Sequence, residues 1–270
     1  MHLLAASLSC LLLIGAAPGP AAPDGKRAPI IEHGPRQMKK IALTFDACPT
    51  SREDEYDEEV IEVLLRENVP ATLFMSGRWV EKNAETAKLL ASKPQFEIGN
   101  HSYWHSHLLE KDDERVLREL MRTQAIIRKV TGKQPIYFRP PFGEVDERVA
   151  KLAAKAGLVT IQYDIASGDP DPGLSAERIV HGVVAQARGG SIVVFHMNGN
   201  GVRTDEVVPA VIRELRQKGY ELVTVGELLK GADRPGTAEQ VRGKGRKGIS
   251  AERPSLPVRQ SGVCHETSPR

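Results

Sequence analysis

Five polar clusters in this sequence carry the side-chain types that hydrolytic enzymes use, and each follows a short apolar run. They are Asp46, the pair His101 and His105, Arg139, the acidic stretch from Asp164 to Asp169, and His196. A run such as Ile41 to Phe45 is typical of a buried strand. Because α/β folds gather function at the carboxyl ends of parallel strands, we predict that these clusters form one site.

The histidine pair indicates a metal site. His101 and His105 are four residues apart, and on a helix or in a tight loop two imidazoles at this spacing can converge on one ion. A bound divalent metal lowers the pKa of its water toward ~7 and polarises a carbonyl. For the nearby His107 we expect a structural role.

The remaining clusters supply an acid and a base for hydrolysis of an acyl group. Asp46 would take the water proton and His196 would protonate the leaving group. Arg139 can hold Asp46 through a bidentate pair, or it can form a surface ion pair. Asp169 can orient His196, or it can be a turn residue before Pro170. Serine chemistry is disfavoured because the sequence has no GxSxG motif.

Short apolar runs alternate with amphipathic helical patterns along the chain. The predicted strands are Lys40–Ala47, Ala71–Ser76, Phe96–Asn100, Ile136–Phe138, Leu158–Tyr163, Ser191–Phe195 and Tyr220–Val225. The predicted helices are Glu55–Asn68, Arg78–Ser92, Asp112–Thr131, Asp146–Ala156, Ser175–Arg188 and Thr204–Lys218. Ser175 and Thr204 are N-cap candidates, and Gly132 is a candidate left-handed C-cap. This alternation predicts parallel strands with helical crossovers, in a barrel or an open doubly wound sheet.

Length and composition fit one large domain with tails. The chain has 270 residues, and 37 basic residues nearly balance 35 acidic ones, so charge gives no reason to expect nucleic acid as a partner. We predict a signal peptide (1–23), a Pro-rich lead-in (24–38), the catalytic domain (39–230) and a disordered basic tail (231–270). The protein is therefore expected to be exported to the periplasm or the extracellular space, as a monomer. An uncleaved N-terminal membrane anchor is the alternative.

Three cysteines leave two alternatives for Cys48, a disulfide or a reduced thiol. Cys10 lies in the predicted signal peptide, and Cys48 and Cys264 can pair in an oxidising compartment. Because Cys264 lies in the predicted tail, we favour a reduced Cys48.

Five motifs occur in an order that resembles the NodB-like polysaccharide deacetylases, carbohydrate esterase family four. They are TFDAC, HSYWH, RPPFG, SGDP and VVFH. The resemblance covers roughly Lys39 to Leu229. It implies a single α/β domain built as a distorted (β/α)7 barrel, a divalent metal such as zinc, and removal of acetyl groups from a carbohydrate polymer.

The resemblance also implies roles for individual residues. These are Asp46 as the base, His101 and His105 as metal ligands, Arg139 as the tether of the base, Phe142 as the residue whose backbone N–H binds the oxyanion, Asp169 as the support of the acid, and His196 as the acid. One position departs from the family pattern, since Ala47 stands where a second, metal-binding acid is usual. Asp46, Asp164, Cys48 and water are the candidates to complete the site.

The resulting hypothesis is a secreted metal-dependent hydrolase that removes N-acetyl groups from a glycan such as peptidoglycan or a chitin-like polymer. O-deacetylation, as of acetylated xylan, is the alternative within the same class. Ala47 motivates a second class, a weakened deacetylase-like protein that binds glycan without turning it over.

Overall fold

The computed structural model of the chain describes residues 28–49 and 56–230. The predicted signal peptide (1–23) and basic tail (231–270) lie outside the described residues, as do Cys10 and Cys264, so those predictions stay predictions. Within the described ranges, no helix combines the length and the apolar character needed to span a bilayer.

Strand β2 (Lys40–Ala47), predicted with these bounds, pairs with three other strands of the sheet. It runs parallel to β8 (Ile192–His196) on one edge. Along the other edge it pairs with β9 (Glu221–Val223) near its start and with β3 (Ala71–Met75) near its end. The site motif TFDAC therefore lies at the end of a strand that has neighbours on both edges and is buried beyond Lys40.

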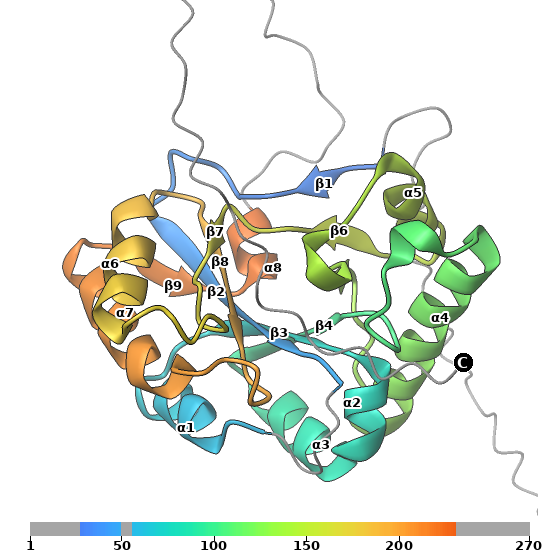
Figure 1. Cartoon of the computed structure of the whole chain (residues 1–270), viewed down its shortest axis with the longest axis horizontal. Coiled ribbons are helices and arrows are strands. Elements are labelled where there is room, and N and C mark those ends of the chain that lie inside the picture. The colour runs from blue at the N-terminus through green and yellow to red at the C-terminus, as the bar shows by residue number, and fades with distance from the viewer. Residues whose placement is uncertain (1–27, 50–55, 231–270) are drawn as a thin grey trace, which may run out of the picture.

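The described strands form one parallel sheet in the order β1-β6-β5-β4-β3-β2-β8-β7, with β9 beside β2. The remaining strands are β1 (Ile30–Ile31), β4 (Phe96–Asn100), β5 (Tyr137–Phe138), β6 (Val159–Ile161) and β7 (Ile165–Ala166). The sheet curls, and most helices lie around its outside (Figure 1). The predicted fold class, a distorted (β/α)7 barrel in a single domain, is confirmed. Two short strands, β1 and β7, were not among the predicted ones.

The helices follow the predicted order, with one interruption and one short final helix that was not predicted. They are α1 (Glu58–Arg66), α2 (Gly77–Lys82), α3 (Ala84–Ser92), α4 (Asp113–Thr131), α5 (Glu147–Lys155), α6 (Ala176–Gln186), α7 (Thr204–Gln217), α8 (Val225–Leu229) and the 3₁₀ turns η1 (Leu108–Glu110) and η2 (Pro141–Gly143). The prediction of one helix over Arg78–Ser92 was wrong. Asn83 has non-helical φ/ψ of −115° and 45°, and its side-chain amide donates to the carbonyl of Trp79, a local bond that competes with helix continuation.

The alternation of side chains along β2 explains how a polar site ends a buried strand. Leu43, Phe45 and Ala47 belong to the main apolar cluster, which also contains residues of α1 and α7. The intervening Thr44 and Asp46 are also buried, but successive residues of a strand face opposite sides of the sheet. The strand thus offers an apolar face to the helices and a polar face to the interior of the half-barrel.

Two of the predicted helix caps are confirmed and one is wrong. The hydroxyl of Ser175 accepts from the backbone N–H of Arg178, and Gly132 closes α4 in the left-handed region with φ 72°. Thr204 does not cap α7. Arg203 is the N-cap residue there, without a side-chain cap bond, and the Thr204 hydroxyl donates to Asp169.

Candidate active site

The carboxyl ends of β5, β4, β2 and β8, strands of one parallel sheet, bring the predicted residues together. Asp46 and His196 are paired residues in the β2–β8 ladder. His101 follows β4 and Arg139 follows β5, and the backbone N–H of Arg139 donates to the carbonyl of Asn100 over 2.9 Å. Parallel strand pairing thus brings residues that are far apart in the sequence together in one polar cluster.

Asp46 and Arg139 form a buried ion pair. Nη1 of Arg139 lies 2.9 Å from Oδ1 of Asp46, and the arginine side chain is only 1% exposed. The same nitrogen donates to the Thr44 hydroxyl over 2.7 Å, and the guanidinium carbon lies 4.2 Å from the ring centre of Phe74. The surface-pair alternative is therefore wrong. The bidentate geometry is wrong too, because Nη2 donates to the carbonyl of Gln162.

The two imidazoles of the HSYWH motif are buried beside this pair. Nδ1–H of His101 donates to the carbonyl of Arg139 over 2.8 Å, which leaves Nε2 of His101 as its lone-pair nitrogen. Burial lowers the pKa of His101, although the charge of Asp46 opposes this. Burial, followed by the charges of His101 and His196, holds the pKa of His105 well below its usual value. Neutral imidazoles are the form that binds a metal.

An acidic side chain on α4 organises the loop that carries both histidines. Ser102 and His105 have positive φ values of 58° and 60°. Oε2 of Glu119 accepts from the backbone N–H of Tyr103, and Oε1 accepts from the Ser106 hydroxyl. These bonds stabilise a backbone conformation that non-glycine residues rarely adopt.

His196 and Asp169 are in contact, as predicted. Nδ1 of His196 lies 3.1 Å from Oδ1 of Asp169, and the backbone N–H of His196 donates to Oδ2. The hydroxyls of Ser167 and Thr204 donate to the same carboxylate. With Nδ1 held in this way, Nε2 of His196 is the nitrogen that can exchange a proton with substrate. Asp169 does lie in a turn before Pro170, and it is also fully buried and bonded to His196, so the two alternatives for this residue hold together.

The hydrogen bonds to Asp169 predict an acid-dependent loss of stability. Burial alone would raise the pKa of Asp169, but the His196 charge and the bonds from His196, Thr204 and Ser167 lower it below 3.8. A carboxyl whose folded-state pKa is lowered stabilises the fold above its unfolded-state value, and that stabilisation disappears as pH falls through the folded-state value. We expect wild type to be more stable than Asp169→Asn near neutral pH, and the gap to shrink below about pH 4.

Urea denaturation across a pH series measures this difference. Thr224→Ala is the matched control. It removes the N-cap side chain of α8, and that side chain is not ionisable. Its cost should stay constant with pH. A gap for Asp169→Asn that stays equally constant down to pH 2 would contradict the assignment.

Phe142 lies over the histidine loop. Its φ of 58° places it in the left-handed region. Its ring contacts that of His105 edge-on, with centroids 4.4 Å apart, and stacks on His107 at 4.1 Å. His107 also pairs with Glu144 over 2.8 Å. His107 thus packs against the RPPFG motif, and these contacts agree with the structural role expected for it.

Asp164 is not part of the site, which corrects its place among the strand-end clusters and the candidate metal ligands. Its carboxylate pairs with Arg36 over 2.8 Å, and it accepts from the Ser191 hydroxyl and the Ile192 backbone N–H. Ile192 opens β8, so Asp164 lies at the amino end of that strand, whereas His196 lies at the carboxyl end.

Three side chains that support the site were not predicted from the sequence. Ser167 and Thr204 bind Asp169, and Glu119 binds the histidine loop. Glu119 had a usable signal, because it lies between the apolar residues Val116 and Leu120 on the buried stripe of α4. A buried acid on an apolar stripe requires partners.

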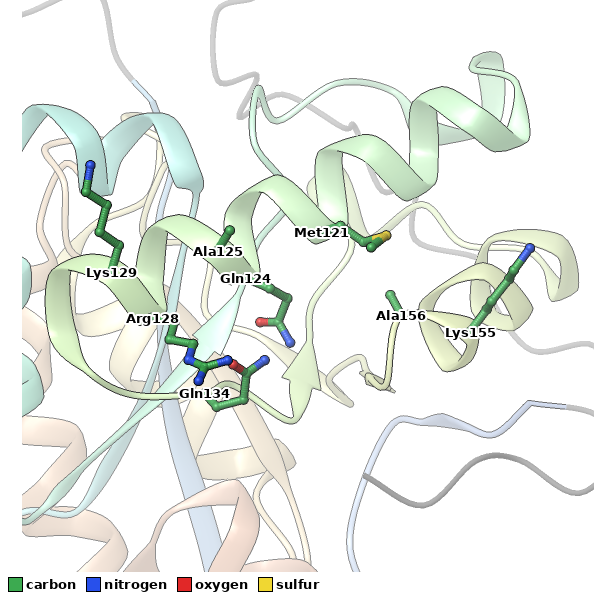
Figure 2. A pocket seen from close by; sticks show the side chains of 8 residues that line it. All are labelled: Met121, Gln124, Ala125, Arg128, Lys129, Gln134, Lys155 and Ala156. Carbon is green, nitrogen blue, oxygen red and sulfur yellow. The ribbon is translucent and has the colours of Figure 1, made fainter. Parts of the chain in front are cut away.

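A hollow elsewhere on the surface does not coincide with this site. It measures about 650 Å³ and is lined by residues of α4, α5 and the turns that follow them, among them Arg128, Gln134 and Lys155 (Figure 2). None of the site residues lines it. The candidate active site is therefore the cluster of polar side chains at the strand ends and not this hollow.

The donor set fits a divalent metal, and the flanking dyads fit hydrolysis. Among the described residues, the ligand atoms of Cys48, His101 and His105 lie within 4.8 Å of one another. Buried neutral imidazoles beside a thiol suit zinc or a similar soft-to-borderline ion. A buried carboxylate, Asp46, and an imidazole oriented by a carboxylate, His196, accompany them. A barrel with this site at the strand ends is typical of metal-assisted hydrolases.

The sequence is similar to those of known proteins. Residues 33–161 match the family described as polysaccharide deacetylase. The chain is 34% identical over 200 residues to a peptidoglycan-N-acetylglucosamine deacetylase of Bacillus cereus, covering 73% of this chain and 91% of that protein. The chain belongs to the polysaccharide deacetylase family, so the resemblance seen in the motifs is confirmed.

Solved structures agree with this placement. One is a peptidoglycan N-acetylglucosamine deacetylase, with a TM-score of 0.69 and 27% identity over 74% of this chain and 92% of that one. Another is described as a family four carbohydrate esterase pseudoenzyme from Bacillus anthracis, with a TM-score of 0.68 and 27% identity over 74% and 69% of the two chains. The same fold thus occurs in an enzyme and in a pseudoenzyme.

Proposed function

We propose that this protein is an exported, zinc-dependent deacetylase that hydrolyses the acetamide groups of N-acetylated glycans, with peptidoglycan as the first candidate polymer. The observation that carries the proposal is the pair of dyads beside the two imidazoles. Asp46 with Arg139, and His196 with Asp169, lie at adjacent strand ends. The peptidoglycan deacetylases among its relatives support the choice of polymer.

Each dyad would perform one proton transfer. Asp46 would accept the proton of the attacking water through Oδ2, because Oδ1 already accepts from Arg139. His196, held at Nδ1 by Asp169, would donate a proton from Nε2 to the departing amine. The backbone N–H of Phe142 would stabilise the developing oxyanion. A divalent ion bound at His101 and His105 would polarise the acetyl carbonyl and acidify water.

Release of acetate from N-acetylglucosamine oligomers tests the function. We expect turnover with zinc, loss of turnover after chelation, and recovery when zinc is added back. Acetylated xylan oligomers serve as the matched ester substrate. Faster release from xylan would overturn the amide specificity while leaving a deacetylase.

A glycan-binding protein without turnover is the second candidate, since Ala47 offers no ligand oxygen and one structural relative is a pseudoenzyme. Saturable binding of the oligomers by zinc-loaded protein, with no acetate released, would favour it. The intact acid and base dyads favour the enzyme.

A further inference from the structure

The thiol of Cys48 lies against the histidine pair, two residues after the proposed base. Sγ of Cys48 is 3.8 Å from Nε2 of His101. The cysteine is fully buried, and its carbonyl accepts from the side-chain amide of Asn198 over 2.7 Å, which anchors the backbone at this position.

The two atoms that face each other, Sγ of Cys48 and Nε2 of His101, are both potential metal ligands. Nδ1–H of His101 is committed to the carbonyl of Arg139, so Nε2, the nitrogen nearest Sγ, is the one with a free lone pair. Two ligands of one tetrahedral zinc ion, a thiolate and an imidazole, lie about 3.5 Å apart, given Zn–S and Zn–N distances of about 2.3 and 2.0 Å. His105 completes a group whose ligand atoms are all within 4.8 Å.

Other candidates for the third position are weaker. Ala47 has no ligand atom and belongs to the apolar cluster with Phe45. Asp164 is paired with Arg36 at the amino end of β8. Oδ2 of Asp46 is also 3.8 Å from Nε2 of His101, but its other oxygen is held by Arg139, and Asp46 is not in the group that converges with His105.

We propose that Cys48 is the third protein ligand, so that the metal is held by one thiolate and two neutral imidazoles. This inference rests on the proposed function only in assuming that a metal binds at His101 and His105. One anionic and two neutral ligands leave a net charge of +1 on a divalent ion. A thiolate selects zinc and cobalt over magnesium and manganese.

Absorption spectroscopy of the cobalt-loaded protein tests the ligand directly. A thiolate bound to Co²⁺ gives a sulfur-to-metal charge-transfer band in the near ultraviolet, separate from the visible bands of the ion. We expect this band in wild type and in the matched control Cys10→Ser/Cys264→Ser, in which Cys48 is the one thiol left of the three in the chain. Adding Cys48→Ser to that control should remove the band.

Calorimetric titration with zinc gives the second readout. Outer contacts of a metal site change affinity by about 10–100-fold, so loss of a direct ligand through Cys48→Ser should weaken zinc binding by at least about 100-fold. Ala47→Asp should not restore that affinity if its side chain stays in the apolar cluster. Circular dichroism checks that each variant is folded.

The outcomes separate the two proposals. A cobalt-loaded control that shows visible bands but no charge-transfer band overturns the thiolate ligand, even if Cys48→Ser fails to fold. Tight zinc binding by Cys48→Ser does the same. In both cases acetate release by the zinc-loaded protein would leave the deacetylase proposal standing. Failure of His101→Gln to weaken zinc binding would overturn the metal site itself.

Discussion

Asp46→Asn is expected to reduce the turnover number for acetate release by about 10²–10⁴, because the amide cannot take the proton of the attacking water. The amide oxygen can still accept from Arg139, which also keeps its contacts with Thr44 and Phe74. We therefore expect a native fold with a lower thermal midpoint, since the buried guanidinium loses its anionic partner. Kinetics on zinc-loaded protein and circular dichroism measure the two effects.

A surface carboxylate provides the matched control for this loss. Asp113→Asn makes the same chemical change in a side chain that is 64% exposed and pairs with Arg148 outside the site. Its turnover should equal that of wild type. Near-normal turnover by a folded, zinc-loaded Asp46→Asn would remove Asp46 from the role of base.

Arg139→Met is expected to destabilise the protein by about 3–5 kcal/mol, because it leaves the Asp46 carboxylate buried without a counter-charge. Methionine retains much of the apolar volume of the arginine stem against Phe74. Activity should fall as well, since the guanidinium holds the base in place. Urea denaturation gives the free energy of unfolding, and kinetics at saturating zinc gives the activity.

The double variant Asp46→Asn/Arg139→Met isolates the ion pair. With no charge left on residue 46, removing the guanidinium should cost clearly less than it does in the wild-type background. Equal costs in the two backgrounds would show that the residues do not interact energetically. The buried 2.9 Å contact between Arg139 and Asp46 would then contribute nothing to the free energy of unfolding.

Local pattern in the sequence was enough to predict the elements that carry the site. Strand β2 has its predicted bounds, and Asp46, Arg139 and His196 occur at or just after strand ends as expected. Such predictions succeed because burial of one face makes apolar residues recur about every two residues in a strand and about every 3.6 residues in a helix. Asn83 shows the limit of this reasoning. The apolar stripe continues from α2 into α3 and so predicts one helix, but Asn83 ends α2 and begins α3.

What the sequence determined by itself was the order of strands and helices, the family motifs and the residue types available for chemistry. Only the tertiary structure decided which of them meet. Thr204 binds Asp169 rather than capping its helix, Asp164 lies at the amino end of β8, away from the site, and the Cys48 thiol faces His101. These contacts join residues separated by about 30–50 positions or more, and they depend on strand register and sheet curvature, which no local pattern encodes.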